Sequence, residues 1–234
     1  MSQKTARILL WTAVFWILAL VWVVPFYSSF TVSFKDMSEI TGGNVHGLPD
    51  NWRVENYEDA WDLGIRRYIP NSLVIVLTSI VGALFLSSLS GFALSQYSFR
   101  GNGLILIIFL FFNLLPPQMN LIPVYRISQA LGIYDTYWAV ILFHIAFQTG
   151  FCTFFFRNFL SGLPDEVFDA ARVEGASEFA DYLRVAVPLS LPAFAALAIL
   201  EFTWLWNDFI WGSVLLQSDT VKPVTVGLQN LRGS

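Results

Sequence analysis

Residues 70–94 read PNSLVIVLTSIVGALFLSSLSGFAL and carry no charged side chain. A helix needs about 20 apolar residues to cross the hydrocarbon core of a bilayer, so this stretch is long enough for one crossing. Small residues recur in it at every fourth position, which places them on one helix face and lets a second helix approach closely. The stretch therefore predicts a packed transmembrane helix with a small-residue seam at Ser79, Ala83, Ser87 and Gly91. The alternative is that these small side chains only face lipid.

Four further apolar stretches flank this one. The chain has 234 residues, of which 56% are apolar and 13% charged, whereas about 25% of residues are charged in a soluble domain. Pro116 and Pro117 interrupt the third stretch, so its second half is expected to continue as a re-entrant or interfacial piece. The predicted fold is all-α, a polytopic transmembrane helical bundle of five spans near residues 8–30, 70–94, 103–122, 135–157 and 188–216.

The first apolar stretch follows Lys4 and Arg7 and is longer than the roughly 7–15 apolar residues of a signal peptide, so we expect an uncleaved span. The polar residues 31–69 are expected to form a water-exposed loop with at most one short helix. The predicted organisation is one transmembrane domain over 1–234, with the first span and external loop in 1–69 and a core in 70–234. Lys and Arg are almost equally numerous on the two predicted sides, and only Lys4 and Arg7 favour a cytoplasmic N-terminus.

The net charge of −4 is spread along the chain, without a basic patch that could hold a phosphate backbone. We therefore expect no nucleic-acid partner. Cys152 is the only cysteine, which excludes an internal disulfide. His144, Gln148 and Cys152 recur every four residues, and one histidine with no carboxylate or second histidine on its stripe is not a metal site, which would need about four ligands. Hydrogen bonding between helices is the expected use of this stripe.

A charge-rich amphipathic stretch occupies residues 161–187. Pro164 followed by two acidic residues predicts the start of a helix, and Gly175 supplies a residue that can adopt positive φ at a helix end. Ser177 is placed to cap a second helix, which ends where Pro188 opens the fifth span. The expected apolar stripe of this second helix is Phe179, Tyr182, Leu183 and Ala186. An interfacial helix lying on the membrane is the alternative, but such helices favour Lys and Arg over an acidic face.

Part of this stretch resembles the coupling motif of permease subunits of bacterial and archaeal ATP-binding-cassette (ABC) importers. The family motif is Glu-Ala-Ala, three residues, Gly, nine residues and Ile-x-Leu-Pro. Here Asp169 replaces the Glu, and Val185 and Val187 replace the Ile and Leu, so each substitution keeps charge or apolar character. The spacing is kept throughout, and a match of this length is more specific than a short pattern. The matching residues are Asp169, Ala170, Ala171, Gly175, Val185, Val187 and Pro188.

The likeness extends to the carbohydrate-importing subfamily, which includes the smaller permease of maltose and sn-glycerol-3-phosphate systems. It is carried by YSFRG at 97–101, NLIPVY at 120–125, LGIYDTYW at 131–138 and WNDFI at 206–210. The resemblance implies a type I ABC importer permease fold. It also implies a sixth span, and this chain reaches Ser234 in what should be the loop before it, so the sixth span is expected to be missing.

The resemblance further implies a role and a set of partners. Residues 161–187, called the coupling segment below, would face the cytoplasm and enter a cleft on an ATPase, where Asp169 would meet a basic side chain and Ala170 and Ala171 would allow close approach. The implied partners are a second permease subunit in a heterodimer, two ATPase subunits that bind ATP and magnesium, and an extracytoplasmic solute-binding protein. The chain itself would bind no cofactor. Its implied location is the prokaryotic cytoplasmic membrane, with multiple spans and a cytoplasmic N-terminus.

A polar and aromatic group in the fifth span is the candidate solute pathway. Ionisable groups inside a bilayer are costly, so Glu201 is a functional-site hypothesis by default. We expect it to share one helix stripe with Trp204, Asn207, Asp208 and Trp211, a combination that suits sugars because rings pack on pyranose faces while polar groups bond hydroxyls. In the alternative, Asp208 and Trp211 mark the outer interface and Glu201 bonds a neighbouring helix. Near the Pro-Pro break, Asn113, Gln118 and Asn120 are further candidates.

The sequence gives less support to two alternative functions, an intramembrane enzyme and a secondary transporter. An intramembrane enzyme would need a nucleophile with a partnered base or a clustered metal site, and the sequence offers neither. A secondary transporter would carry charges in several spans and no cytoplasmic docking segment. The chain also lacks a GxxxxGK[ST] phosphate loop, so ATP hydrolysis is expected in a partner and this chain is not expected to be an enzyme.

Overall fold

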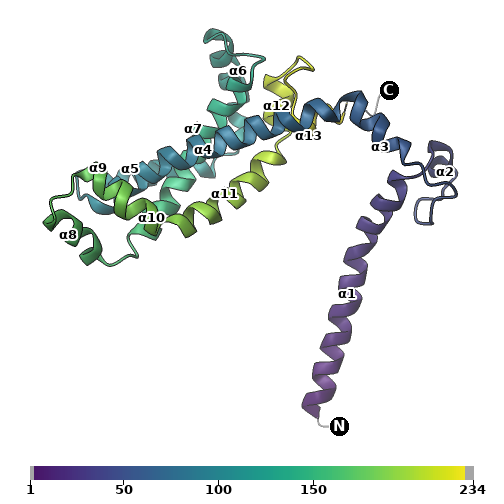
Figure 1. Cartoon of the computed structure of the whole chain (residues 1–234), viewed down its shortest axis with the longest axis horizontal. Coiled ribbons are helices and arrows are strands. Elements are labelled where there is room, and N and C mark those ends of the chain that lie inside the picture. The colour runs from purple at the N-terminus through teal and green to yellow at the C-terminus, as the bar shows by residue number, and fades with distance from the viewer. Residues whose placement is uncertain (1–2, 230–234) are drawn as a thin grey trace. The chain divides into compact units, whose positions relative to one another are not determined.

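The computed structural model describes residues 3–229, and this part of the chain is helical with no strand (Figure 1). The all-α prediction is therefore confirmed. The chain divides into two compact units, residues 1–63 and 64–234, which are described separately. The predicted boundary after residue 69 and the single-domain organisation stay predictions.

The first unit contains one long helix and a polar segment. Helix α1 (Gln3–Ser33) has a mean hydropathy of 2.4 in its most apolar part, none of which is buried. A helix that is apolar all round suits a lipid environment. The following segment forms two short helices, α2 (Met37–Thr41) and α3 (Glu55–Ala60). It is held together by the buried Lys35, whose Nζ donates to the backbone oxygen of Asn44 at 2.5 Å, and by an ion pair of 3.2 Å between Arg53 and Asp36.

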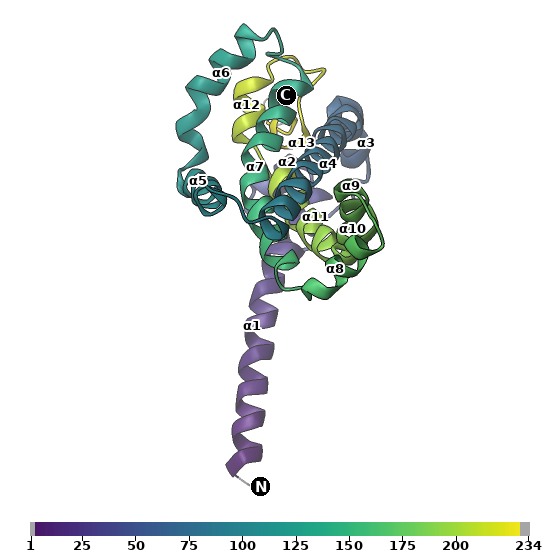
Figure 2. The same ribbon diagram turned by 90° about the vertical axis from the view of Figure 1, so that its left-hand side faces the viewer.

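The second unit is organised around α4 (Arg66–Gln96) and α7 (Tyr137–Leu160), which lie side by side in both views (Figures 1 and 2). Ser79, Ala83 and Ser87 are at most 1% exposed. A Cβ added at Gly91 would lie only 2.6 Å from the Cβ of Phe156 on α7, so no larger residue fits there without a shift. These contacts confirm the small-residue seam as a packing surface.

The predicted break at Pro116 and Pro117 is also present. Helix α5 (Asn102–Leu114) is followed by a 3-10 turn (Pro117–Asn120) and by α6 (Leu121–Ala130), with a bend of 94° between the two halves. α5 packs on α7 at Gly150, where an added Cβ would lie 2.7 Å from the side-chain nitrogen of Asn113. Proline has no N–H and cannot continue the helical ladder, which explains the break.

The fifth predicted span differs from the structure at its C-terminal end. Helix α11 (Leu191–Trp206) stops at Trp206, and a separate short helix α12 (Ile210–Leu215) follows, so the prediction of a helix continuing to residue 216 is wrong. Asp208 favours a new helix start here, because its carboxylate accepts the backbone N–H groups of Trp211 and Gly212, in the first turn of α12, at 3.4 and 3.3 Å. The last described helix is α13 (Val224–Gly227).

The described part of the chain has three to five helices or bent helix pairs that could cross a membrane, against five spans predicted from the sequence. Within residues 3–229, three helical stretches are long and apolar enough, namely Gln3–Ser33, Glu55–Gln96 and Tyr137–Leu160. The number rises to five if the two bent pairs, Asn102–Leu114 with Pro117–Ala130 and Glu178–Leu189 with Leu191–Trp206, each form one span.

Candidate functional site

The coupling segment has the predicted helix–turn–helix form. Helix α8 (Asp165–Val173) starts directly after Pro164, and Gly175 adopts a φ of +83° at the turn. The N–H of Ala176 donates to the carbonyl of Ala171 at 3.0 Å, which closes the turn over the end of α8. Ser177 then caps α9 (Glu178–Asp181) by accepting the N–H of Ala180 at 3.3 Å.

The second helix is longer than α9 alone. A π-helical turn (Tyr182–Ala186) and α10 (Val187–Leu189) continue it to Leu189, so it passes Pro188 and ends at Ser190. The axis bends by 69° between this helix and α11. The π turn lies just before Pro188, whose missing N–H disturbs the regular ladder there. The bend separates the coupling segment from the apolar span that follows.

Buried aromatic side chains anchor the coupling segment to the second unit. Phe168 of α8 is 0% exposed and packs 6.3 Å, ring centre to ring centre, from Phe92 of α4. The hydroxyl of Tyr182 lies 2.7 Å from the Oγ of Ser88, also on α4. Leu160 and Ala186 complete this cluster. The segment is therefore a packed element rather than a flexible loop.

The predicted apolar stripe is only half buried. Tyr182 and Ala186 belong to the cluster, whereas Phe179 and Leu183 are 64% and 47% exposed. The buried face is narrower than the stripe because α4 and α8 cover only the side that bears Tyr182 and Ala186. The exposed pair leaves an apolar surface on the outside of the segment.

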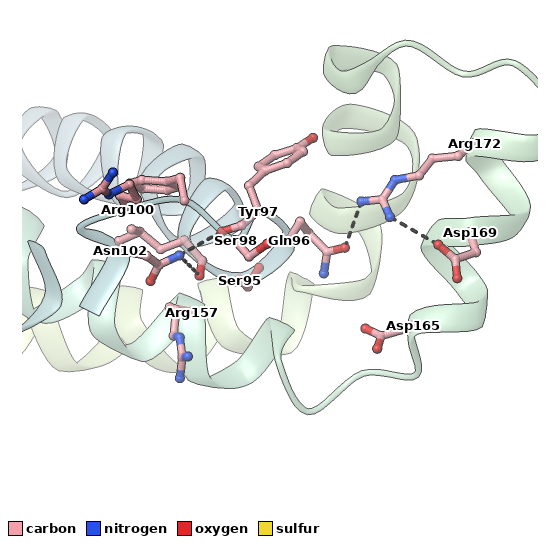
Figure 3. Close-up of a pocket in the computed structure, with 12 residues that line it drawn as sticks. Ser95, Gln96, Tyr97, Ser98, Arg100, Asn102, Arg157, Asp165, Asp169 and Arg172 are labelled. Atoms are coloured by element: carbon pink, nitrogen blue, oxygen red, sulfur yellow. Dashed lines mark hydrogen bonds and ion pairs between the residues drawn. The ribbon is translucent and has the colours of Figure 1, made fainter. Parts of the chain in front are cut away.

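Arg172 joins three helices at this site, and Figure 3 shows its contacts with Asp169 and Gln96. Its guanidinium lies 3.2 Å from Asp169 on α8 and donates to the side-chain oxygen of Gln96, at the end of α4, also at 3.2 Å. Its Nε lies 3.7 Å from Asp181 of α9. Arg172 was not among the residues predicted for the site, although the Asp169–Arg172 spacing of three is one at which helical side chains meet. Asp169 thus has a basic partner within its own chain.

Asp181 is the buried member of this network. Its side chain is 1% exposed and neither carboxylate oxygen accepts a hydrogen bond from the described residues. Burial raises the pKa of Asp181, and the charge of Arg172 opposes that rise. The carboxylate therefore depends on Arg172 for its compensation.

A cavity of about 780 Å³ opens beside α8 (Figure 3). It lies between the end of α4, the loop that leads to α5, the last turn of α7 and α8. Arg100 and Arg157 lie on one side, and Asp165 and Asp169 project from α8 on the other. A charged side chain of either sign would find an opposite charge in this cavity.

The residues of the coupling motif lie at different depths. Ala170 and Pro188 are exposed, while Ala171, Val185 and Val187 are half-buried. Val173 is the most exposed large apolar side chain of α8 at 88%. With Phe179 and Leu183 it gives the segment apolar groups that no described residue covers.

The pathway candidates are only partly brought together. Asn113, Trp204 and Asp208 line a second cavity of about 400 Å³ together with His144 and Gln148 of α7. Asn207 is exposed, and its side-chain N–H donates to the carbonyl of Thr203 at 2.7 Å; Gln118 is exposed as well. Neither lines this cavity, and Asn120 lines a neighbouring one. The prediction that Glu201, Asp208 and Trp211 share one stripe of a single helix is wrong, because α11 ends at Trp206.

Glu201 lies behind this cavity rather than on its wall. It is 0% exposed and accepts hydrogen bonds from the side-chain nitrogen of Gln148 at 2.6 Å and from the Sγ of Cys152 at 3.3 Å. The structure thus has the alternative arrangement, in which Glu201 bonds a neighbouring helix. The stripe of Gln148 and Cys152 on α7 supplies the donors, as expected of it.

His144 and Asp208 pair across the same cavity. The Nε2 of His144 lies 3.6 Å from the Oδ2 of Asp208, and the two side chains are 8% and 16% exposed. Trp211 stacks on Phe143 with ring centres 3.5 Å apart. No group of three or more metal-ligating side chains occurs within residues 3–229, and the pairing of His144 with Asp208 was not foreseen from the sequence.

Comparisons with known proteins agree with this architecture. Residues 83–231 match the family model described as binding-protein-dependent transport system inner membrane component. A probable ABC transporter permease, YurM of Bacillus subtilis, is 31% identical over 86% of this chain and 66% of its own length. The arabinooligosaccharides transport system permease AraQ, also of Bacillus subtilis, is 32% identical over 94% of this chain and 79% of that protein.

A solved structure shares the fold. It is a bacterial ABC transporter involved in the import of the acidic polysaccharide alginate; the match has a TM-score of 0.84 and 24% identity and covers 98% of this chain and 81% of that one. The family is one of transporter permeases rather than of catalytic enzymes, and no comparison supports an intramembrane enzyme or a secondary transporter. The chain belongs to the binding-protein-dependent transport system inner membrane component family and is an ABC importer permease.

Proposed function

We propose that the chain moves a sugar or a related small polar solute across the prokaryotic cytoplasmic membrane by alternating access, driven by a partner ATPase. The family and the name of the relative AraQ, which refers to arabinooligosaccharides, support a carbohydrate solute. The aromatic and polar cavity with Trp204, Asp208 and Asn113 supports the same class, because rings and hydrogen-bonding groups together suit pyranoses.

The observation that carries the proposal is the locked coupling segment. Phe168 and Tyr182 fix it to α4, and Arg172 ties α8, α9 and the end of α4 together. A push on this segment would therefore move α4 and, through the seam, α7. A flexible loop in the same place would absorb the displacement instead of transmitting it.

The docking surface for the ATPase would combine three features. Val173 and Phe179 offer exposed apolar contacts, and Ala170 allows close approach. Asp169 is 67% exposed despite its pairing with Arg172, so it stays available to a basic side chain of the partner. The cavity beside α8 offers room for such a side chain.

The assembled transporter would contain this chain, a second and homologous permease, two ATPase subunits and an extracytoplasmic solute-binding protein. ATP and magnesium would bind the ATPases, and this chain would hold no cofactor. We propose that the N-terminus and the coupling segment both face the cytoplasm. Glu201 is proposed to support the pathway wall from behind, while Asn207 and Gln118 would contribute only where the second permease approaches.

The conformation of Gly175 provides a direct test of the proposal. A valine at a φ of +83° is strained by about 1–2 kcal/mol, whereas asparagine tolerates this region. Nothing lies within 4 Å of an added Cβ, so the strain acts on the turn and not through a clash. We expect Gly175→Val to reduce solute uptake at least tenfold in proteoliposomes of the full complex, and Gly175→Asn to keep most of it.

Copurification of the ATPase with each variant completes this experiment. Loss of uptake together with weaker ATPase binding, or with ATP hydrolysis no longer stimulated by solute, would support a role in coupling. Uptake by Gly175→Val equal to that of the unaltered chain would contradict the proposal.

A further inference from the structure

The cavity between α7, α11 and α12 has aromatic walls and a small polar end. Trp204 lies 5.5 Å, ring centre to ring centre, from Phe151, and the stacked rings of Trp211 and Phe143 form another part of the wall. Phe147 is also a lining residue. The polar end contains Asn113, His144, Gln148 and Asp208.

Hydrogen-bond acceptors dominate the polar end. The side-chain nitrogen of Gln148 is directed at the buried Glu201, and that of Asn113 donates to the carbonyl of Phe109 at 2.9 Å. The side-chain carbonyl oxygens of both amides have no partner among the described residues. Asp208 is an acceptor that a ligand can still reach, because its side chain is 16% exposed. The free positions thus favour a ligand that donates hydrogen bonds.

The local charge has one sign. None of the residues that line the cavity is Lys or Arg. Asp208 lies at its wall, and Glu201 lies one hydrogen bond behind Gln148. His144 is the only lining residue that could carry a positive charge, and it lies against Asp208. A carboxylate or phosphate entering this space would meet like charge in a medium of low dielectric constant and would find few donors.

We infer that this cavity is a subsite for neutral or amino sugars and that it discriminates against sugar acids and sugar phosphates. Sugar hydroxyls would donate to Asp208 and to the amide oxygens while the ring packs on Trp204. An amino sugar would gain further from its ammonium group, through Asp208 and through the faces of the aromatic rings. The inference rests on the proposed sugar transport and narrows its substrate class.

Three monosaccharides of matched ring shape test the inference. Equilibrium binding of radiolabelled glucose, glucosamine and glucuronate is measured on the purified permease complex without its solute-binding protein. We expect glucuronate to bind at least tenfold more weakly than glucose, and glucosamine to bind at least as well as glucose. Tighter or equal binding of glucuronate would overturn the inference.

Asp208→Asn removes the charge but keeps one acceptor oxygen, which can still pair with a backbone N–H of α12 or with a sugar hydroxyl. We expect this variant to reduce the discrimination against glucuronate to less than threefold and to remove any preference for glucosamine. Trp204→Ala is expected to weaken the binding of all three sugars by more than tenfold. The matched control is Trp138→Phe, at an exposed tryptophan outside the cavity, which should leave binding unchanged.

The two proposals fail separately. If none of the three sugars binds but ATP-driven uptake of another solute persists, or if Asp208→Asn leaves the discrimination unchanged, the subsite is wrong and the transport proposal stands. If the complex neither binds its ATPase nor takes up any solute, the transport proposal itself is wrong.

Discussion

Replacement of Gln148 by leucine is expected to lower the free energy of unfolding by about 3 kcal/mol. Glu201 is completely buried, and Gln148 supplies its shorter hydrogen bond, with Cys152 as a weaker second donor. Leucine fills a similar volume but cannot donate, so the carboxyl group loses most of its compensation. Denaturant unfolding of the purified chain in detergent, followed by circular dichroism, measures the change.

A second substitution distinguishes the buried charge from simple packing. In the Gln148→Leu background, Glu201→Leu should recover most of the lost stability, because replacing both polar partners by apolar groups can be nearly neutral. Gln118→Leu is the matched control, since Gln118 is exposed. If Gln148→Leu lowers the free energy of unfolding equally in the unaltered chain and in the Glu201→Leu chain, the hydrogen bond between Gln148 and Glu201 contributes little to stability.

Arg172→Ala is expected to have the largest effect on coupling. It removes the cation that lies against Asp169 and Asp181 and the hydrogen bond to Gln96. We expect Arg172→Ala to lower the free energy of unfolding by about 2 kcal/mol. This is less than the cost of breaking a fully buried ion pair, because Arg172 keeps part of its hydration. Uptake by the reconstituted complex should fall by at least tenfold, since α8 is no longer tied to α4 and α9. Arg184→Ala, at an exposed arginine of the same segment, is the control.

The stability loss caused by Arg172→Ala is expected to depend on pH through the titration of Asp181. Burial raises the pKa of Asp181 above that of the unfolded chain, so its protonated form is favoured in the fold. The stabilisation that comes from protonating Asp181 is therefore fully present below the pKa of Asp181 in the unfolded chain. It is lost as the pH rises through the pKa of Asp181 in the folded chain. Without Arg172 the folded pKa is higher still, so the deficit of Arg172→Ala should shrink as pH falls from 7 towards 4. Asp181→Asn in the same background should abolish this pH dependence.

The helices and their main interruptions could be predicted from the sequence, because length, apolar character and proline act locally. The small-residue seam from Ser79 to Gly91 and the turn at Gly175 could also be predicted from local sequence. A four-residue period indicates the seam, and one glycine indicates the turn. The end of α11 at Trp206 was not evident. It depends on Asp208 pairing with backbone N–H groups in the first turn of α12, and apolar residues continue on both sides of the break.

The internal partners of the site could not be predicted either, because they come from distant parts of the chain. Arg172 meets Gln96 across 76 positions, and Gln148 meets Glu201 across 53. Periodicity ranks residues on one helix but does not say which helix lies opposite. For this reason the sequence did not indicate which residue of α7 donates to Glu201, or that Asp169 pairs with Arg172.

The side of the membrane on which the coupling segment lies is the most direct test of the account. Val173→Cys places an exposed thiol on α8, and the one native cysteine, Cys152, is buried, so a membrane-impermeant maleimide should report position 173 alone. We predict labelling in inside-out vesicles and not in right-side-out vesicles, with protection from the label when the partner ATPase is bound. Labelling from the outer side, or labelling that the ATPase does not reduce, would contradict the account.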